Sequence, residues 1–239
     1  MRVIEPTPLA RAASEALGPV RDEVVVVGAL AVEIALSGSE IALTPTADVD
    51  AGTRAEDVAA VVTHLEATGF ERSNLAHERT FTWVKDGVKV QLMRPFHPFP
   101  SPQAKGLPEN NLVAELEANK WEVAFAEDLE IGRFWSARPA ALVALKEAAF
   151  GRQRFGSDRV VDRDFSDAVL LLDHHRRLIR EEAARSPQLQ QRIARAAERL
   201  SEDPTHAVRE LVAIGQVENV LAGEALVSRV ARETVEDLS

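Results

Sequence analysis

The stretch that decides the fold is Val24-Val25-Val26-Val27-Gly28-Ala29, followed further on by Thr46-Ala47-Asp48-Val49-Asp50. Four β-branched residues in a row predict a strand that is buried on both faces. A glycine directly after such a strand, where a helix is predicted over 29–36, lets the backbone approach a phosphate closely, and the helix N-terminus supplies amide donors. A single glycine at such a position is more often an ordinary strand-to-helix turn, so the motif needs support from elsewhere.

Asp48 and Asp50 provide that support, because they lie two residues apart where polar and apolar residues alternate. In a strand, residues with this spacing face the same side of the sheet. Two adjacent carboxylates repel each other unless a cation lies between them, and oxygen ligands suit Mg²⁺ or Mn²⁺. Isolated Asp-x-Asp pairs are common on surface strands and turns, so we interpret this one as a metal site only together with the Gly28 turn.

A second group of candidate residues lies on predicted helices. Lys146 falls in a helix expected to start at Ser136-Ala137-Arg138-Pro139, with Ser136 as its cap and the proline in its first turn. Asp164 and Asp167 fall near the start of a second helix, predicted over 163–183. Outside a motif, a lysine in such a helix is typically an ordinary surface residue.

The predicted elements change from mixed α/β to all α near residue 130. Two strands, expected over 80–84 and 88–93 and joined by Asp86-Gly87, belong to the first part. The second part is predicted to consist of amphipathic helices up to the C-terminus. We therefore predict a small α/β core over 1–130 and a helical domain over 131–239.

The formal net charge is −10, which argues against a general nucleic-acid-binding surface, but the charge is unevenly distributed. Residues 131–200 carry 14 Lys and Arg against 9 Asp and Glu, whereas residues 201–239 carry 3 against 8. The basic stretch is either a set of solvated helix faces or a surface for polyphosphate or RNA. Charge alone leaves both alternatives open.

The composition excludes several kinds of protein. The chain contains no cysteine, so it has no disulfide, no thiolate metal site and no cysteine nucleophile. No apolar run approaches the roughly 20 residues of a membrane span, and the N-terminus lacks the pattern of a secretory signal. The sequence has neither a P-loop nor a G-x-S-x-G elbow. We expect a cytoplasmic protein without membrane association.

The motifs resemble those of a known superfamily. V-V-G-A-L-A-V followed by T-A-D-V-D resembles the polymerase-β-like nucleotidyltransferase signature, which is hydrophobic-Gly-Gly/Ser, a helix, and Thr-x-Asp-hydrophobic-Asp. L-V-A-L-K-E-A-A-F-G-R-Q-R and D-R-D-F-S-D-A-V-L-L-L resemble the third and fourth motifs of the toxin-like AbiEii-type nucleotidyltransferases. Together the matches span residues 24–172. The resemblance implies an α/β (α+β) fold, with a small mixed-sheet nucleotidyltransferase core followed by an all-α C-terminal region.

The resemblance also implies roles in the first part of the chain. Gly28 and the Ala29 amide would contact the triphosphate of an NTP substrate. Asp48 and Asp50 would coordinate Mg²⁺ or Mn²⁺ at that triphosphate.

Further roles are implied in the second part of the chain. Lys146 would neutralise phosphate charge, and Asp164 would act as a general base or orient the nucleotide, with Asp167 as the alternative. Arg152 and Arg154 would contact phosphate or the acceptor, or else form a solvated helix end favoured by the helix dipole.

The sequence departs from the superfamily pattern at three places. Ala29 replaces the second glycine or serine, and Thr44 and Pro45 occupy a region where a basic residue is common. Many polymerase-β-like enzymes have a third carboxylate on a later strand, and the corresponding place here is Val90-Gln91-Leu92. Gln91 cannot act as a base and is a poorer ligand for a hard cation.

Two functions therefore stay open. The first is a metal-dependent nucleotidyltransferase that moves an NMP from an NTP to a hydroxyl of an RNA end such as that of tRNA, of a protein or of a small molecule. In a toxin–antitoxin system it would also need an antitoxin partner. The second is a catalytically silent relative that binds a nucleotide or a partner protein. A chance series of motifs on an α/β module with a helical tail is the third alternative.

Overall fold

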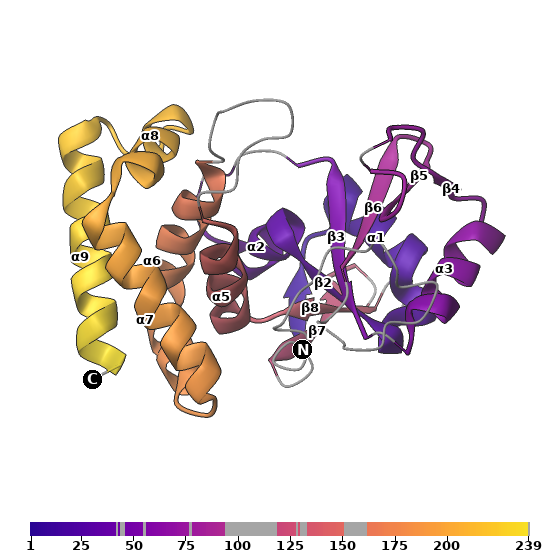
Figure 1. Ribbon diagram of the computed structural model, residues 1–239, viewed down its shortest axis with the longest axis horizontal. Helices are drawn as coiled ribbons and strands as arrows, with labels where there is room; N and C mark the ends of the chain where they lie inside the picture. Colours follow the sequence, from indigo (N-terminus) through magenta and orange to yellow (C-terminus); the bar gives the residue numbers. More distant parts are fainter. Residues whose placement is uncertain are drawn as a thin grey trace. The chain divides into compact units, whose positions relative to one another are not determined.

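The computed structural model forms two compact units, and each is considered by itself. The first unit comprises Met1–Ser37 and Thr46–Arg138, and the second comprises Gly38–Pro45 and Pro139–Ser239. The structure describes residues 1–41, 43, 46–54, 56–76, 78–93, 119–127, 129, 133–150 and 162–238. The first unit carries a mixed sheet and the second is mostly helical, which confirms the predicted fold class (Figure 1).

The described strands of the first unit form an eight-stranded mixed sheet with the order β1-β7-β8-β2-β3-β6-β5-β4. Strand β2 lies in its interior, antiparallel to β3 and parallel to β8, and β3 is parallel to β6. The strands are β1 Arg2–Ile4, β2 Val24–Val27, β3 Asp48–Thr53, β4 Glu71–Arg72, β5 Thr82–Lys85, β6 Val88–Met93, β7 Lys120–Phe125 and β8 Phe134–Ala137.

Strand β2 is the predicted buried strand, since all four of its valines are buried. The β5–β6 hairpin is also confirmed, and its turn residues Asp86 and Gly87 both have positive φ, at 50° and 82°. Two positive φ values in a two-residue loop are the geometry that matches the twist of an antiparallel pair. The sequence pattern therefore predicted both the buried strand and the hairpin turn.

One local prediction is wrong. Ser136 does not cap a helix, because it lies in β8, where it pairs with Val26 on one side and Trp121 on the other. The helix that follows begins at Pro139, so the proline does fall in the first turn, as predicted. Strand pairing over a long sequence distance has overridden a local sequence that is typical of a helix start.

Short helices accompany the sheet in the first unit. They are α1 Pro8–Leu17, the 3₁₀-helix η1 Gly18–Glu23, α2 Gly28–Leu36 and α3 Val58–Ala67. The Thr7 hydroxyl caps α1 by accepting from the Ala10 amide, which explains its start. His64 of α3 bonds the carbonyl of Ala16 at 3.1 Å and so ties α3 to α1.

The second unit is built from α5 Pro139–Ala149, α6 Arg163–Ala183, α7 Pro187–Glu202, α8 Thr205–Ala213 and α9 Val220–Leu238. Helix α5 packs against α6 and α7, and α9 packs against α6, α7 and α8 (Figure 1). The Ser186 hydroxyl caps α7 by accepting from the Leu189 amide, with Pro187 in the first turn. Among the described helices, none combines the length and the apolar character that crossing a membrane requires.

Candidate functional site

The two carboxylates of the Asp-x-Asp motif lie on one face of β3. Asp48 and Asp50 are half-buried, whereas Val49 and Ala51 between and after them are fully buried. The strand therefore directs its apolar side chains into the core and both carboxylates to the other face. The hydroxyl of Thr46 accepts a hydrogen bond from the Asp48 amide at 3.4 Å, which fixes the start of the motif.

Gly28 lies directly against Asp50, and its lack of a side chain is what makes this approach possible. It has a φ of +65°, and a Cβ built on it would overlap the carboxylate and lie 2.8 Å from the Asp50 carboxyl carbon. The N-cap residue of α2 is Val27, whose side chain makes no capping hydrogen bond. The Asp50 carboxylate thus lies beside the first residue of α2, where the helix dipole favours negative charge.

Strand β6 adds two polar residues to the same face. In the β3–β6 register, Lys89 lies beside Asp48 and Gln91 lies beside Asp50. On the far side of Gln91, the β5–β6 register places Thr82. Since residues paired across neighbouring strands share a face, Asp50, Gln91 and Thr82 form one row across three strands.

The structure therefore places Gln91 where the resemblance would put a third carboxylate. Sequence reasoning missed Lys89 and Thr82 altogether. Alternation within 88–93 indicates that Lys89 and Gln91 share a face, but only the register shows that this is also the face of the Asp pair. Lys89 pairs with Glu78 at 3.4 Å, and Glu78 accepts a hydrogen bond from the Ser73 hydroxyl at 3.0 Å.

The donor set on this face fits one divalent ion. Within the described ranges, no group of three or more His, Cys, Asp and Glu side chains is arranged to hold a metal. The β3 pair supplies two carboxylates, and Gln91 supplies a neutral amide oxygen next to them. Mg²⁺ commonly takes one or two carboxylates and completes its shell with water and substrate phosphates, so the pair suits an ion that arrives with a nucleotide.

The helical unit holds the second group of candidates together. The Lys146 ammonium donates to Asp164 at 3.0 Å and to Asp167 at 2.6 Å, and all three residues are buried. Arg163 forms an ion pair with the same oxygen of Asp167, at 3.7 Å. The cluster comes from the C-terminal part of α5 and the first turns of α6, where the motif spacing predicted these residues.

The carboxylates keep Lys146 charged. Burial disfavours the ammonium, but the negative charges of Asp167 and Asp164 outweigh this and hold the pKa of Lys146 above its ordinary value of 10.5. Two of the three ammonium protons are engaged by these partners. The cluster therefore joins α5 to α6.

The second unit contains other buried carboxylates that nothing in the sequence pattern marked. Glu182 accepts a hydrogen bond from the Ala140 amide at 3.0 Å and so caps the start of α5. Asp162 contacts His206 at 2.6 Å and accepts from Arg209 at 3.0 Å, which joins the start of α6 to α8. Their partners lie far away in sequence, so only the packing of the helices identifies them.

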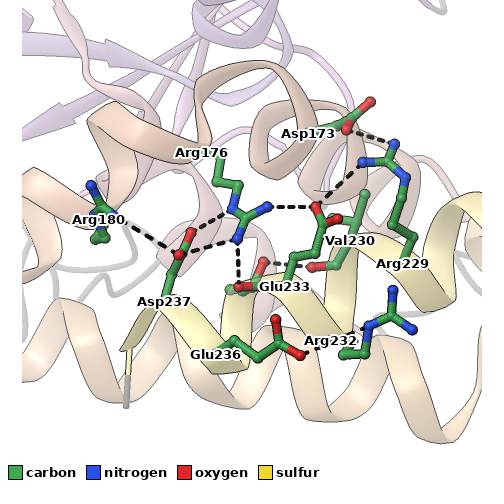
Figure 2. Close-up of polar contacts among 10 residues, drawn as sticks. Asp173, Arg176, Arg180, Arg229, Val230, Arg232, Glu233, Glu236 and Asp237 are labelled. Atoms are coloured by element: carbon green, nitrogen blue, oxygen red, sulfur yellow. Dashed lines mark hydrogen bonds and ion pairs between the residues drawn. The ribbon is translucent and has the colours of Figure 1, made fainter.

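Acidic residues of α9 engage the basic residues of α6. Arg176 bonds both Glu233, at 2.7 Å, and Asp237, and Arg180 also pairs with Asp237, at 3.6 Å (Figure 2). In the same network Arg229 of α9 reaches back to Asp173 of α6, at 2.9 Å (Figure 2). The basic stretch and the acidic C-terminal stretch therefore neutralise each other in part.

The structure brings Gly28, Asp48 and Asp50 together in the first unit. In the second unit it brings Lys146 together with Asp164 and Asp167. Ala29 is the second residue of α2. Arg152, Arg154, Thr44 and Pro45 lie outside the described residues. The catalytic and binding roles assigned to these residues stay predictions.

No protein-family model matches the chain, and the search of curated proteins finds no match either. Among solved structures, the chain is similar to an antigenic nucleotidyltransferase-like protein from Paracoccidioides brasiliensis. The two sequences are 14% identical, the match covers 92% of this chain and 94% of the other, and the TM-score is 0.49.

Proposed function

We propose that this protein is a metal-dependent nucleotidyltransferase that moves a nucleoside monophosphate from an NTP to an acceptor hydroxyl. The observation that carries the proposal is the close approach of Gly28, the first residue of α2, to the Asp50 carboxylate. A backbone without a side chain, two carboxylates on one strand face and a helix N-terminus are together what a metal-bound triphosphate requires.

In the proposed reaction, the acceptor oxygen attacks the α-phosphorus of the NTP. The bond from that phosphorus to the bridging oxygen of pyrophosphate breaks, and the acceptor proton leaves to a base or to water. Asp48 and Asp50 would hold Mg²⁺ or Mn²⁺, which supplies charge neutralisation at the phosphates when it is bound. The amides at the start of α2, that of Ala29 included, would face the triphosphate.

The acceptor is proposed by class. An RNA end such as that of tRNA, a protein side chain and a small molecule all offer the required hydroxyl. A toxin role with an antitoxin partner extends this proposal to physiology. A toxin would use the same residues and the same reaction.

One observation favours a second function. Gln91 lies beside Asp50 in the register, where a carboxylate base would otherwise face the acceptor. A protein with this change would bind a metal–nucleotide complex without transferring the nucleotide. The two functions differ in turnover and share the binding step.

The experiment incubates the purified chain with each α-³²P-labelled NTP, with Mg²⁺ or Mn²⁺, and with total bacterial RNA, protein or an aminoglycoside mixture. Asp48→Asn is the test variant, because it keeps the shape of the side chain and removes one negative charge. Glu71→Gln on the edge strand β4 is the control, since it also converts a carboxylate to an amide but at an exposed position.

We expect wild type and Glu71→Gln to transfer label and Asp48→Asn to lose at least about 100-fold in rate, because it weakens metal binding. Binding of NTP that depends on Asp48 but yields no transfer would support the silent binder. If Asp48→Asn matches wild type in both assays, the proposal is wrong.

A further inference from the structure

We propose that Gln91, held in place by Thr82, is a neutral third oxygen ligand of the metal, so that the site binds the ion only as a metal–nucleotide complex. This inference rests on the proposed function. It concerns whether the ion binds alone or together with the nucleotide. Its basis is the row Asp50–Gln91–Thr82 across strands β3, β6 and β5.

The first step of the argument is the state of Thr82. This residue is completely buried, and its hydroxyl has no hydrogen-bond partner within the described part of the chain. Burying a hydroxyl without a partner is unfavourable, so a neighbouring side chain that could satisfy it is expected. Among the described residues, a side chain on the same sheet face is the nearest candidate for that partner.

Gln91 is the neighbour that can serve. It lies directly opposite Thr82 on the same sheet face, where Cβ atoms of paired residues are about 5 Å apart, and it is only half-buried. Rotation of its side chain brings the amide group within reach of the Thr82 hydroxyl. A glutamine amide carries both donors and an acceptor, so the same side chain can also serve a second partner.

The position of Asp50 determines which way the amide points. When the amide nitrogen donates to the Thr82 hydroxyl, the amide oxygen faces the opposite side, towards Asp50 in the register. A divalent ion at Asp48 and Asp50 selects this orientation, because the alternative aims positive amide hydrogens at the cation. Without the ion, the reversed amide can instead donate to the Asp50 carboxylate.

The charge of the resulting site explains how the ion would enter. Asp48 and Asp50 supply two negative charges, and Gln91 contributes an oxygen without charge. Affinity for hard divalent cations depends on the number of charged ligands, and Mg²⁺ is usually held by one or two carboxylates together with substrate phosphates. The protein alone therefore holds the ion weakly, and the phosphates of the nucleotide complete the site.

The test measures Mn²⁺ binding by electron paramagnetic resonance, with and without a non-hydrolysable α,β-methylene NTP. Wild type is compared with Asp48→Asn and with three variants of similar size: Gln91→Glu, Gln91→Leu and Thr82→Val. Thermal unfolding of each variant is recorded alongside, so that a loss of binding is not confused with a loss of folding.

Wild type should bind Mn²⁺ weakly alone and at least about tenfold more tightly with the analogue. Gln91→Glu should raise the affinity for Mn²⁺ alone by about tenfold, because it adds a third charged ligand. Gln91→Leu and Thr82→Val should each weaken binding of the Mn²⁺–analogue complex by about tenfold, the usual effect of losing an orienting partner. Thr82→Val should leave thermal stability unchanged or higher, which a purely structural role for the hydroxyl would not allow.

The outcomes separate this inference from the proposed function. If Asp48→Asn abolishes binding of the Mn²⁺–analogue complex while Gln91→Leu and Thr82→Val match wild type, the inference is wrong and the proposed function stands. Tight binding of Mn²⁺ to wild type without the analogue would also overturn the inference. If Asp48→Asn has no effect, the proposed function fails and this inference fails with it.

Discussion

At the scale of single residues, the contact between Gly28 and Asp50 can be tested through one added methyl group. In Gly28→Ala the new Cβ would overlap the Asp50 carboxylate, and the residue would also have to adopt a φ of +65°. We expect a loss of stability of more than about 1–2 kcal/mol, the cost of a left-handed conformation alone, and loss of the metal–nucleotide complex. Urea unfolding and the Mn²⁺ binding assay measure the two effects.

Gly38→Ala is the matched control for this substitution. Gly38 has a φ of +83°, but a Cβ there would meet no atom within 4 Å. The control therefore carries the backbone cost without the contact to Asp50. Equal effects of the two substitutions on Mn²⁺–nucleotide binding would show that the contact has no functional role.

Lys146 offers a second prediction at the residue scale. Lys146→Met removes the cation from two buried carboxylates, Asp164 and Asp167. Removing one partner of a buried ion pair typically costs about 3–5 kcal/mol, and Arg163 still neutralises part of the Asp167 charge, so we expect a loss near the lower end of that range in urea unfolding. Converting both aspartates to asparagine in the same chain should restore part of it. A loss below about 1 kcal/mol in Lys146→Met would contradict the buried ion cluster.

The pH dependence of stability follows from the same cluster. The pKa of Lys146 is raised in the folded state, so the folded protein keeps this proton at pH values where the unfolded chain has lost it. The contribution of Lys146 is fully present below its ordinary pKa of 10.5 and is lost as pH rises through the higher, folded-state value. Above pH 10, the free energy of unfolding measured in urea should fall with rising pH in wild type, and it should fall less steeply in Lys146→Met.

How much of the site the sequence could predict depends on how far apart the contacts lie along the chain. Gly28, Asp48 and Asp50 were predicted as a group because a strand, a turn and a two-residue spacing are local features. The two-residue Asp86-Gly87 loop places Thr82 opposite Gln91, although Thr82 was not singled out. Lys89 was not predicted as a neighbour of Asp48, because that contact depends on the register between β3 and β6, which no short turn connects. Register is set by the packing of a whole sheet face, which a single sequence does not display.

At the scale of elements, the same distinction explains which strands and helices could be predicted. Helix α6 has the predicted bounds, since its apolar positions repeat over many turns. Strands β7 and β8 were missed, and Ser136-Ala137-Arg138-Pro139 was interpreted as a helix start. These residues fit a helix cap locally, but Ser136 pairs with Val26 at the centre of the sheet. Only the complete sheet supplies that competing interaction.

The α6–α9 ion network gives a prediction at this scale. Arg176→Met removes bonds to both Glu233 and Asp237, and the pairs are only partly exposed. We expect a loss of about 1 kcal/mol, near the upper end for surface pairs, that shrinks in 1 M salt. Arg177→Met is the control, since Arg177 is highly exposed and pairs within its own helix with Glu181. Equal losses in the two variants would contradict a link between the helices.

Acid should weaken this network. The hydrogen bond and charge of Arg176 hold the pKa of Asp237 below its ordinary value of 3.8. The contribution of Asp237 is therefore present above pH 3.8 and is lost as pH falls through the lower, folded-state value. Below pH 3.8, the free energy of unfolding should fall with decreasing pH less steeply in Arg176→Met than in wild type, which urea unfolding at a series of pH values measures.

At the scale of the whole molecule, the distribution of charge limits how RNA could bind. The excess of Lys and Arg over 131–200 suggests a surface that binds phosphate. In the structure, however, Arg176, Arg180 and Arg192 form ion pairs. Their partners are Glu233 and Asp237 of α9 and Glu147 of α5. A phosphate would have to displace these carboxylates, so each such contact releases fewer counterions than a free arginine would.

We therefore predict that any RNA binding by this chain depends only weakly on salt. Each neutralised phosphate contributes about −0.7 to −0.9 to the slope of log K against log salt, and we expect a total slope shallower than about −3. Fluorescence anisotropy of labelled tRNA between about 50 and 300 mM KCl measures it. Glu233→Gln combined with Asp237→Asn should steepen the slope, because it releases Arg176 and Arg180. A wild-type slope steeper than about −6 would mean that a substantial phosphate-binding surface exists despite these pairs, and would make RNA the favoured acceptor.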